Sequence, residues 1–390
     1  MKFFDKNIGV FEVVLFLIIL FVYNFIAYSI VSDIPQHVDF LLSYLKGNMP
    51  IPTNFLYYYT IYSISFFTAN KSVLLLVAVY TLTIVTFWKY NIVKAILINE
   101  IKNTSRAIVI ASFSSFLLIF CFSSPFILFF IDYYYLMSYT PNIWHNSTMI
   151  FAMPFVIMLF WQTVQQLENY SSKRNIFIVI LIVLNILAKP SFLFVYVVAF
   201  PLMVIKKVGF SLSFFKYMIP VVIALLLGGV EYYFIYLAPQ PDFLKSTIKI
   251  DFFHLMLIWL QTKNWGYLIF MFIITIISSF TFPIVLLIKN RLLLKSEKIQ
   301  FALICVILGL IIGFTFYETG VREWDGNFMW QTLMASFILF FVSVIELLKL
   351  IVNQPNGWKT HRLEIIFFVM HFCSGVYYIV ERLFIEGGYG

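Results

Sequence analysis

Runs of about twenty apolar residues recur along the whole chain and constrain its fold more than any other feature. A helical run of this length crosses the roughly 30 Å hydrocarbon core of a bilayer. Such runs lie near residues 9–31, 72–90, 107–131, 146–165, 217–237, 265–288, 299–317, 329–348 and 365–381. No small-residue cleavage site follows the first run, so we expect an uncleaved first helix.

The composition excludes a soluble protein and indicates one all-α transmembrane domain over residues 1–390. Apolar residues make up 62% of the chain and charged residues 11%, which leaves too little polar surface for a globule in water. The formal net charge is +8, but the Lys and Arg are scattered, so no nucleic-acid partner is expected. Richness in Phe, Ile, Lys and Asn indicates an A+T-rich bacterial genome and hence a multi-pass protein of a bacterial cell membrane.

A tenth apolar region, residues 176–205, is interrupted by Lys189-Pro190 and reads either as one bent span or as a hairpin of two short helices. The positive-inside rule favours the hairpin. With a cytoplasmic N-terminus, it places most of the 26 Lys and Arg, Lys89 and Lys94 included, in inner segments. The sequence therefore predicts a polytopic helical bundle with about eleven transmembrane helices.

The first outer loop, residues 32–70, is predicted to hold two interfacial helices, at about residues 36–46 and 54–67. The first has its apolar residues on one stripe, which is typical of a helix lying in the membrane plane. The second is rich in tyrosine, which suits the headgroup level or a surface on which sugars stack.

Asp33, His37 and Asp39 begin this loop, with Pro35 in the first turn of the expected helix. Asp33 and His37 are four residues apart and would meet near its N-terminus, at the mouth of the bundle. A capping role alone would account for Asp33 but not for all three residues. We therefore consider them candidate catalytic groups.

Two further outer segments could bind an anion. His145 and Asn146 precede a helix that opens with Ser and Thr, and the N–H groups at such a start favour anions, although Asn146 could serve only as a cap. Residues 176–188 rise only about 20 Å, so Lys189 should lie below the outer surface and face protein or a water-filled cavity, unless it snorkels to the interface. Glu231, inside an apolar run, could line that cavity or pair with Lys189.

The outer loop over residues 318–328 concentrates acids and one arginine between two apolar runs. Its Arg322 suits a bidentate phosphate contact. The alternative is a surface loop whose charges neutralise one another. The other candidates in this loop are Glu318, Asp325 and Asn327.

The architecture resembles the GT-C superfamily of membrane glycosyltransferases, which take sugars from polyprenyl-phosphate carriers on the outer face of the membrane. The resemblance is carried by the multi-helix bundle, by Asp33 directly after the first helix, and by the two interfacial helices. The blocks PQHVDF, PNIWHNST, AKPSF and GVREWDGNF are also similar to those of bacterial proteins of this type. The large soluble C-terminal domain of some members has no counterpart here.

The resemblance implies an inverting transfer to a glycan or lipid-linked acceptor, with Asp33, or as the alternative Asp39, as general base. It assigns the donor phosphate to Arg322, Lys189, His145 and Asn146, and contacts with sugar or acceptor to His37, Glu318, Asp325 and Asn327. No obligatory metal is expected, although Asp33, Asp39 and Asp325 could hold a divalent cation if they converge.

Other classes of function stay open. A polysaccharide polymerase would share the outer site, but such proteins usually carry more outer arginines. A non-enzymatic transporter of a lipid-linked or anionic substrate would use short interrupted helices around Lys189 and would need a corresponding broken helix in the other half of the chain, which the sequence does not reveal. A membrane acyltransferase using His145 is a further alternative.

Overall fold

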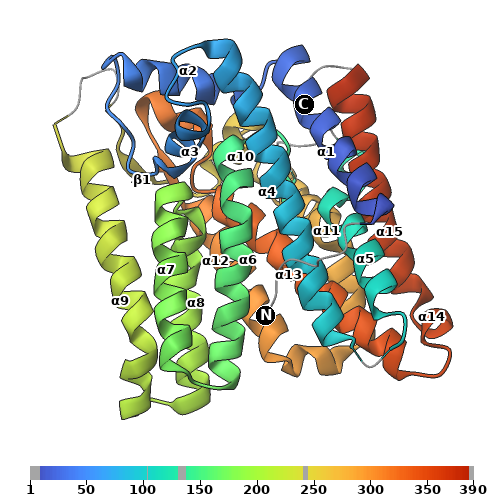
Figure 1. Cartoon of the computed structure of the whole chain (residues 1–390). Coiled ribbons are helices and arrows are strands. Elements are labelled where there is room, and N and C mark those ends of the chain that lie inside the picture. Colours follow the sequence, from blue (N-terminus) through green and yellow to red (C-terminus); the bar gives the residue numbers. More distant parts are fainter. Residues whose placement is uncertain (1–8, 103, 131–137, 240–244, 386–390) are drawn as a thin grey trace.

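The protein is a bundle of long helices that run between two ends (Figure 1). The computed structural model describes residues 9–102, 104–130, 138–239 and 245–385. Within these residues, ten helical segments are long and apolar enough to cross a membrane, which confirms a multi-pass, almost entirely helical protein. They are α1 (Val10–Ser29), α4 (Lys71–Glu100), α5 (Ala107–Phe120) with η1 (Pro125–Phe129), α6 (Ser147–Glu168), α8 (Ser191–Val208), α9 (Leu212–Tyr232) with η2 (Tyr233–Leu237), α11 (Trp265–Lys289), α12 (Glu297–Thr315), α13 (Trp330–Asn353) with η5 (Gly320–Asp325), and α15 (Arg362–Tyr377) with η6 (Tyr378–Ile385).

The chain folds back at Lys189-Pro190, between α7 (Ser172–Ala188) and α8. Lys189 has an extended backbone, φ −167° and ψ 112°, because the residue before a proline is driven out of the helical region. In a hairpin, α8 must end at the same end of the bundle at which α7 begins. The Asn175 side chain, in the first turn of α7, donates to the backbone oxygen of Lys216, near the start of α9, at 3.2 Å, so the chain has returned to that end after α8. With 17 residues, α7 is the short helix that would bring the number of spans to the expected eleven.

Two short helices, α2 (Asp33–Leu45) and α3 (Leu56–Ile64), follow α1, and α2 lies across the top of the bundle in Figure 1. The buried residues of α2 are Ile34, Val38 and Leu41, a spacing that places them on one face. Both helices expected in the first outer loop are therefore present. The first begins at Asp33, earlier than expected, since Pro35 fits the first turn of a helix.

Helix α4 is much longer than the expected span of residues 72–90, and this changes the position of two lysines. It has 30 residues, and Lys89 and Lys94 are 8% and 4% exposed within it. Both lysines, expected in an inner segment after the span, therefore lie within the helix itself. Charge ended the apolar run in the sequence, but the helix continues because neighbouring helices supply polar partners, such as Glu12 of α1 at 2.8 Å from the ammonium of Lys94.

A small antiparallel ribbon, absent from the sequence prediction, joins two loops at the α2 end. Strand β1 (Ile248–Ile250) pairs with β2 (Phe316–Glu318), Ile248 opposite Glu318. The ribbon is followed by α10 (His254–Trp259) on one side and by η5 on the other. Gly320 has φ +77°, and a Cβ there would lie 2.6 Å from the Lys245 carbonyl oxygen, so the turn requires glycine.

The opposite end of the bundle carries basic residues paired with buried or partly buried acids. Lys298 and Lys349 bind Glu100 at the end of α4, and Lys289 binds Glu364 at 2.7 Å. The connections η4 (Arg291–Lys295) and α14 (Gly357–Thr360) lie at this end. The bundle thus has two different ends, one that carries these basic residues and one formed around α2.

Candidate functional site

Polar side chains from five parts of the chain meet beneath α2 and α3. We call this group the polar cluster. Its members come from α2, the segment before α6, the α7–α8 turn, α9 and the β2–η5 loop. They are Asp33, His37, His145, Asn146, Lys189, Glu231, Glu318, Arg322, Asp325 and Asn327.

Asp33 is held by Asn146. The Asn146 side-chain nitrogen donates to Asp33 Oδ2 at 2.8 Å, and its Oδ1 accepts the backbone N–H of Met149 at 3.0 Å. Asn146 is therefore the cap of α6, one of the two roles expected from the sequence, and its other end positions the carboxylate. Asp33 is half-buried and lines an open hollow of about 630 Å³, together with residues 28–32, 35, 36 and 39. One side of the carboxylate is thus fixed while another faces open space.

His37 links helices α2 and α3. Its Nδ1 lies 2.6 Å from the hydroxyl of Tyr58 in α3, and its ring packs against Tyr57. Burial lowers the pKa of His37 to about 4, although the Asp33 carboxylate opposes this shift. The ring is therefore neutral near pH 7, and it can exchange hydrogen bonds but carries no charge.

His145 is 5% exposed, and burial lowers its pKa to about 4 against a smaller opposing effect of Asp33. The resemblance assigned His145 to the donor phosphate. A neutral imidazole cannot offer that phosphate a positive charge, so in this position it could act only through a hydrogen bond.

Lys189 is the buried cation of the cluster, 8% exposed. Its ammonium lies 3.4 Å from Thr148 Oγ1 in the first turn of α6 and 4.8 Å from the ring centre of Trp330. Lys189 therefore faces protein, which is one of the arrangements expected from the sequence. Burial lowers its pKa to about 8, and four carboxylates oppose that shift: Asp33, Asp325, Glu231 and Glu318.

Glu318, 3% exposed, organises the loop between β2 and α13. Its carboxylate accepts hydrogen bonds from the Tyr236 hydroxyl and the Asn327 side chain, and it lies 3.5 Å from a guanidinium nitrogen of Arg322. With three partners inside the protein, Glu318 positions Arg322 and Asn327. It is less open to a substrate than the sequence suggested.

Glu231 is a member of the cluster that sequence reasoning placed only loosely. It is 6% exposed on α9 and accepts a hydrogen bond from Thr53 at 3.2 Å. Lys189 and Arg322 both act on its charge. An acid inside an apolar run was the signal for Glu231, whereas its partner Thr53 left no distinctive pattern in the sequence.

Asp39 lines the same hollow as Asp33 but is paired with a residue outside the polar cluster. Its carboxylate pairs with the Lys71 ammonium at 2.6 Å, and both side chains are about half exposed (52% and 53%). Asp33, Asp39 and Asp325 are not brought together as a divalent site. Across the described ranges, no group of three His, Cys, Asp or Glu side chains could hold a metal ion.

Comparisons of this chain with models of protein families, with curated proteins and with solved structures give no match.

Proposed function

We propose that the protein is a membrane glycosyltransferase that moves a sugar from a polyprenyl-phosphate carrier to a glycan or lipid-linked acceptor on the outer face of a bacterial membrane. The observation that carries the proposal is the position of Asp33. Its carboxylate is held by Asn146, lines an open hollow, and lies near enough to Lys189 to stabilise the ammonium electrostatically. A base beside a buried cation suits a reaction that takes a proton and releases an anion.

The proposed reaction is a single displacement with inversion. Asp33 takes the proton of an acceptor hydroxyl, the hydroxyl oxygen bonds to the anomeric carbon, and the bond from that carbon to the phosphate oxygen breaks. The electron pair leaves with the polyprenyl phosphate. Lys189 and Arg322 stabilise the charge that develops on the phosphate oxygen, and little of their orientation has to change during the step.

The surroundings of Lys189 support its role toward phosphate. It is fixed by Thr148 and by the face of Trp330, and the first turn of α6 next to it presents N–H groups that favour an anion. Arg322, 3.5 Å from Glu318, adds a planar guanidinium at the rim.

The orientation follows from the distribution of basic residues. Lysines gather at the end of the bundle opposite α2, where Lys289, Lys298 and Lys349 are paired with acids. By the positive-inside rule, that end is cytoplasmic, the N-terminus is cytoplasmic, and the polar cluster opens to the outer face.

A transporter is the second candidate, because two interrupted helices lie side by side in the bundle. The α5 helix ends at Phe120 before η1, and α11 has a non-helical residue at Phe280. Ser124 and Ser278 bridge these breaks, with the Ser124 backbone N–H donating to the Ser278 carbonyl at 2.9 Å. Paired breaks of this kind are typical of transporter substrate sites.

One experiment separates the two candidates. Asp33→Asn in the producing cell keeps the size of the side chain but removes its basicity, and mass spectrometry of the surface glycan then shows whether a sugar is missing. The proposal predicts loss of one sugar with normal protein level in the membrane. An unchanged glycan would exclude Asp33 as the general base. Loss of the whole glycan without a truncated product would favour the transporter.

A further inference from the structure

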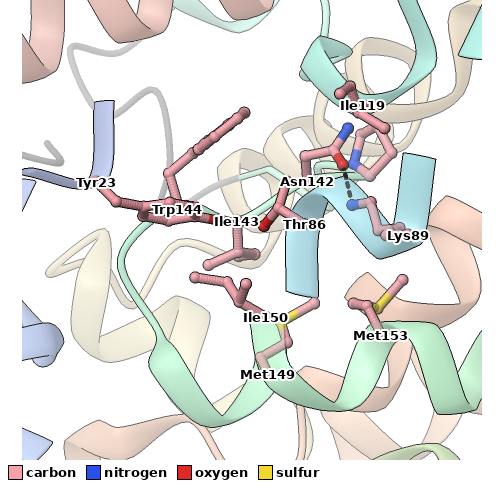
Figure 2. Close-up of a pocket in the computed structure, with 11 residues that line it drawn as sticks. Tyr23, Thr86, Lys89, Ile119, Asn142, Ile143, Trp144, Met149, Ile150 and Met153 are labelled. Carbon is pink, nitrogen blue, oxygen red and sulfur yellow. Dashed lines mark hydrogen bonds between the residues drawn. The ribbon is translucent and has the colours of Figure 1, made fainter. Parts of the chain in front are cut away.

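Lys89 is a buried cation that the proposed reaction does not use. It lies in α4 and is 8% exposed, and its ammonium donates to Asn142 Oδ1 at 2.6 Å (Figure 2). The ammonium also lies 4.2 Å from the ring centre of Phe337. Among the described side chains, no carboxylate lies within ion-pair distance of Lys89. A charged group kept at this depth without an acid requires a specific partner, and that partner is Asn142.

Asn142 connects Lys89 to the end of a helix. Its side-chain nitrogen donates to the carbonyl oxygens of Leu118 at 2.9 Å and Cys121 at 2.7 Å. These carbonyls belong to the last turn and C-cap of α5, where oxygens lack helical partners and the helix dipole is negative. The side-chain oxygen of Asn142 thus accepts a hydrogen bond from the Lys89 ammonium, and its side-chain nitrogen donates hydrogen bonds to carbonyl oxygens at the end of α5.

The space beside Lys89 is too small for a substrate. The pocket in Figure 2 holds about 10 Å³ and is lined by residues such as Tyr23, Thr86 and Trp144. That volume accommodates about one water molecule. Lys89 therefore acts on the protein around it rather than on a ligand.

The segment that Lys89 contacts through Asn142 continues along the chain to the polar cluster. Asn142 lies in the middle of the buried segment 138–146, and Asn146, four residues further on at its end, donates to Asp33. Thr140 adds a further bond within the segment, to the Asn142 carbonyl at 3.1 Å. The segment has no regular secondary structure. These side-chain bonds help to fix its conformation, together with the bond from the Tyr139 N–H to Ser279 and the packing of Trp144 against Phe120.

We propose that Lys89 is a positioning residue of the candidate site: through Asn142 it fixes the segment that presents Asn146 to Asp33. Its effect on catalysis rests on the proposed function. Its effect on geometry does not. Lys94 provides the matched control, because it is also a buried lysine of α4 but pairs with Glu12 of α1, away from the segment.

The test for geometry uses cysteines introduced by Asp33→Cys and Asn146→Cys in a chain without its native thiols, joined by a short bis-thiol crosslinker. We expect Lys89→Met to lower the crosslinking yield several-fold, Lys89→Gln to restore much of it because an amide can still donate to Asn142, and Lys94→Met to leave it unchanged. Equal yields in Lys89→Met and its parent would overturn the proposal. If Lys89→Met fails to fold, the comparison rests on Lys89→Gln and Lys94→Met. Crosslinking yields that are equally low in these two variants would also overturn the proposal, because the effect would then not be specific to Lys89.

The test for catalysis uses single and double variants with native Asp33. We expect Lys89→Met to lower kcat about 10- to 100-fold with little change in KM. In an Asn146→Ser background the same change should add little, because both act through one bond. Fully additive losses would contradict the positioning role. Absence of sugar transfer by the unaltered protein, together with the expected crosslinking, would refute the proposed function and leave the geometric inference standing.

Discussion

Replacing Asn146 by serine separates its two roles. The Asn146 oxygen caps α6 through the N–H of Met149 at 3.0 Å, and its nitrogen holds Asp33 at 2.8 Å. Serine is about as good a helix cap as asparagine, but its single hydroxyl is too short to reach Asp33 as well. Asn146→Ser should therefore keep the helix start and lose the contact with the carboxylate.

The magnitude follows from the type of bond. A hydrogen bond to a charged group contributes about 1.5–3 kcal/mol, which corresponds to roughly a 10- to 100-fold loss in kcat/KM if Asp33 is misplaced in the transition state. The free energy of unfolding should change by only a few tenths of a kcal/mol. Asn146→Ala also removes the cap and should cost about 1 kcal/mol of stability in addition.

The assay compares sugar transfer and thermal unfolding of both variants purified in the same detergent. The expected result is a similar loss of activity in Asn146→Ser and Asn146→Ala, with lowered thermal stability only in Asn146→Ala. Full activity of Asn146→Ser would refute the argument that this amide positions Asp33. Loss of activity in proportion to lost stability would show that the residue acts only on the fold.

Three further predictions concern the surroundings of the cluster. Lys189 loses its charge as the pH rises through its pKa of about 8, so KM for the donor should increase above pH 8. Lys189→Arg should shift this increase in KM to higher pH, because arginine stays charged. An increase that occurs at the same pH in both proteins would exclude Lys189 as its origin. Glu318→Ala should leave the Tyr236 hydroxyl and the Asn327 amide without their acceptor and lower stability by about 1–3 kcal/mol for each group that stays buried, which calorimetry would detect; an unchanged transition would contradict the role given to Glu318. In Gly375→Ala, the new Cβ would lie 1.6 Å from the Phe120 carbonyl oxygen, and we expect a loss of about 1–3 kcal/mol or more as α15 moves away from α5, checked by the same transition.

Much of the fold could be predicted because lipid imposes simple rules on the sequence. Helix length and apolar runs gave most of the spans, and the basic residues selected the hairpin at Lys189-Pro190. Pro35 and the apolar stripe after it gave α2. The length of α4 could not be predicted, since Lys89 and Lys94 end the apolar run, and only their partners Asn142 and Glu12 explain why the helix continues.

The candidate site was predictable as a set of residues but not as a geometry. Each residue was selected for its place in the sequence: Asp33 after the first apolar run, His145 before a helix start, Lys189 inside an apolar region and Arg322 in a charged loop. Nothing local revealed that Asn146 would hold Asp33, a contact across 113 positions.

The same limit explains the residues of the site that the sequence misjudged. The sequence did not distinguish the roles of Asp39 and Asp33, because the ion pair between Asp39 and Lys71 is visible only in the structure. The neutral state of His145 depends on burial, which sequence reasoning does not supply.

The most direct test of the account is the fate of a polyprenyl-phosphate sugar given to the purified protein in lipid vesicles with a suitable acceptor. We expect release of free polyprenyl phosphate and an acceptor carrying the sugar with inverted anomeric configuration, and a fall in rate of about 100-fold or more for Asp33→Asn. Movement of the intact donor across the bilayer without cleavage, or equal rates for the protein and its Asp33→Asn variant, would contradict it.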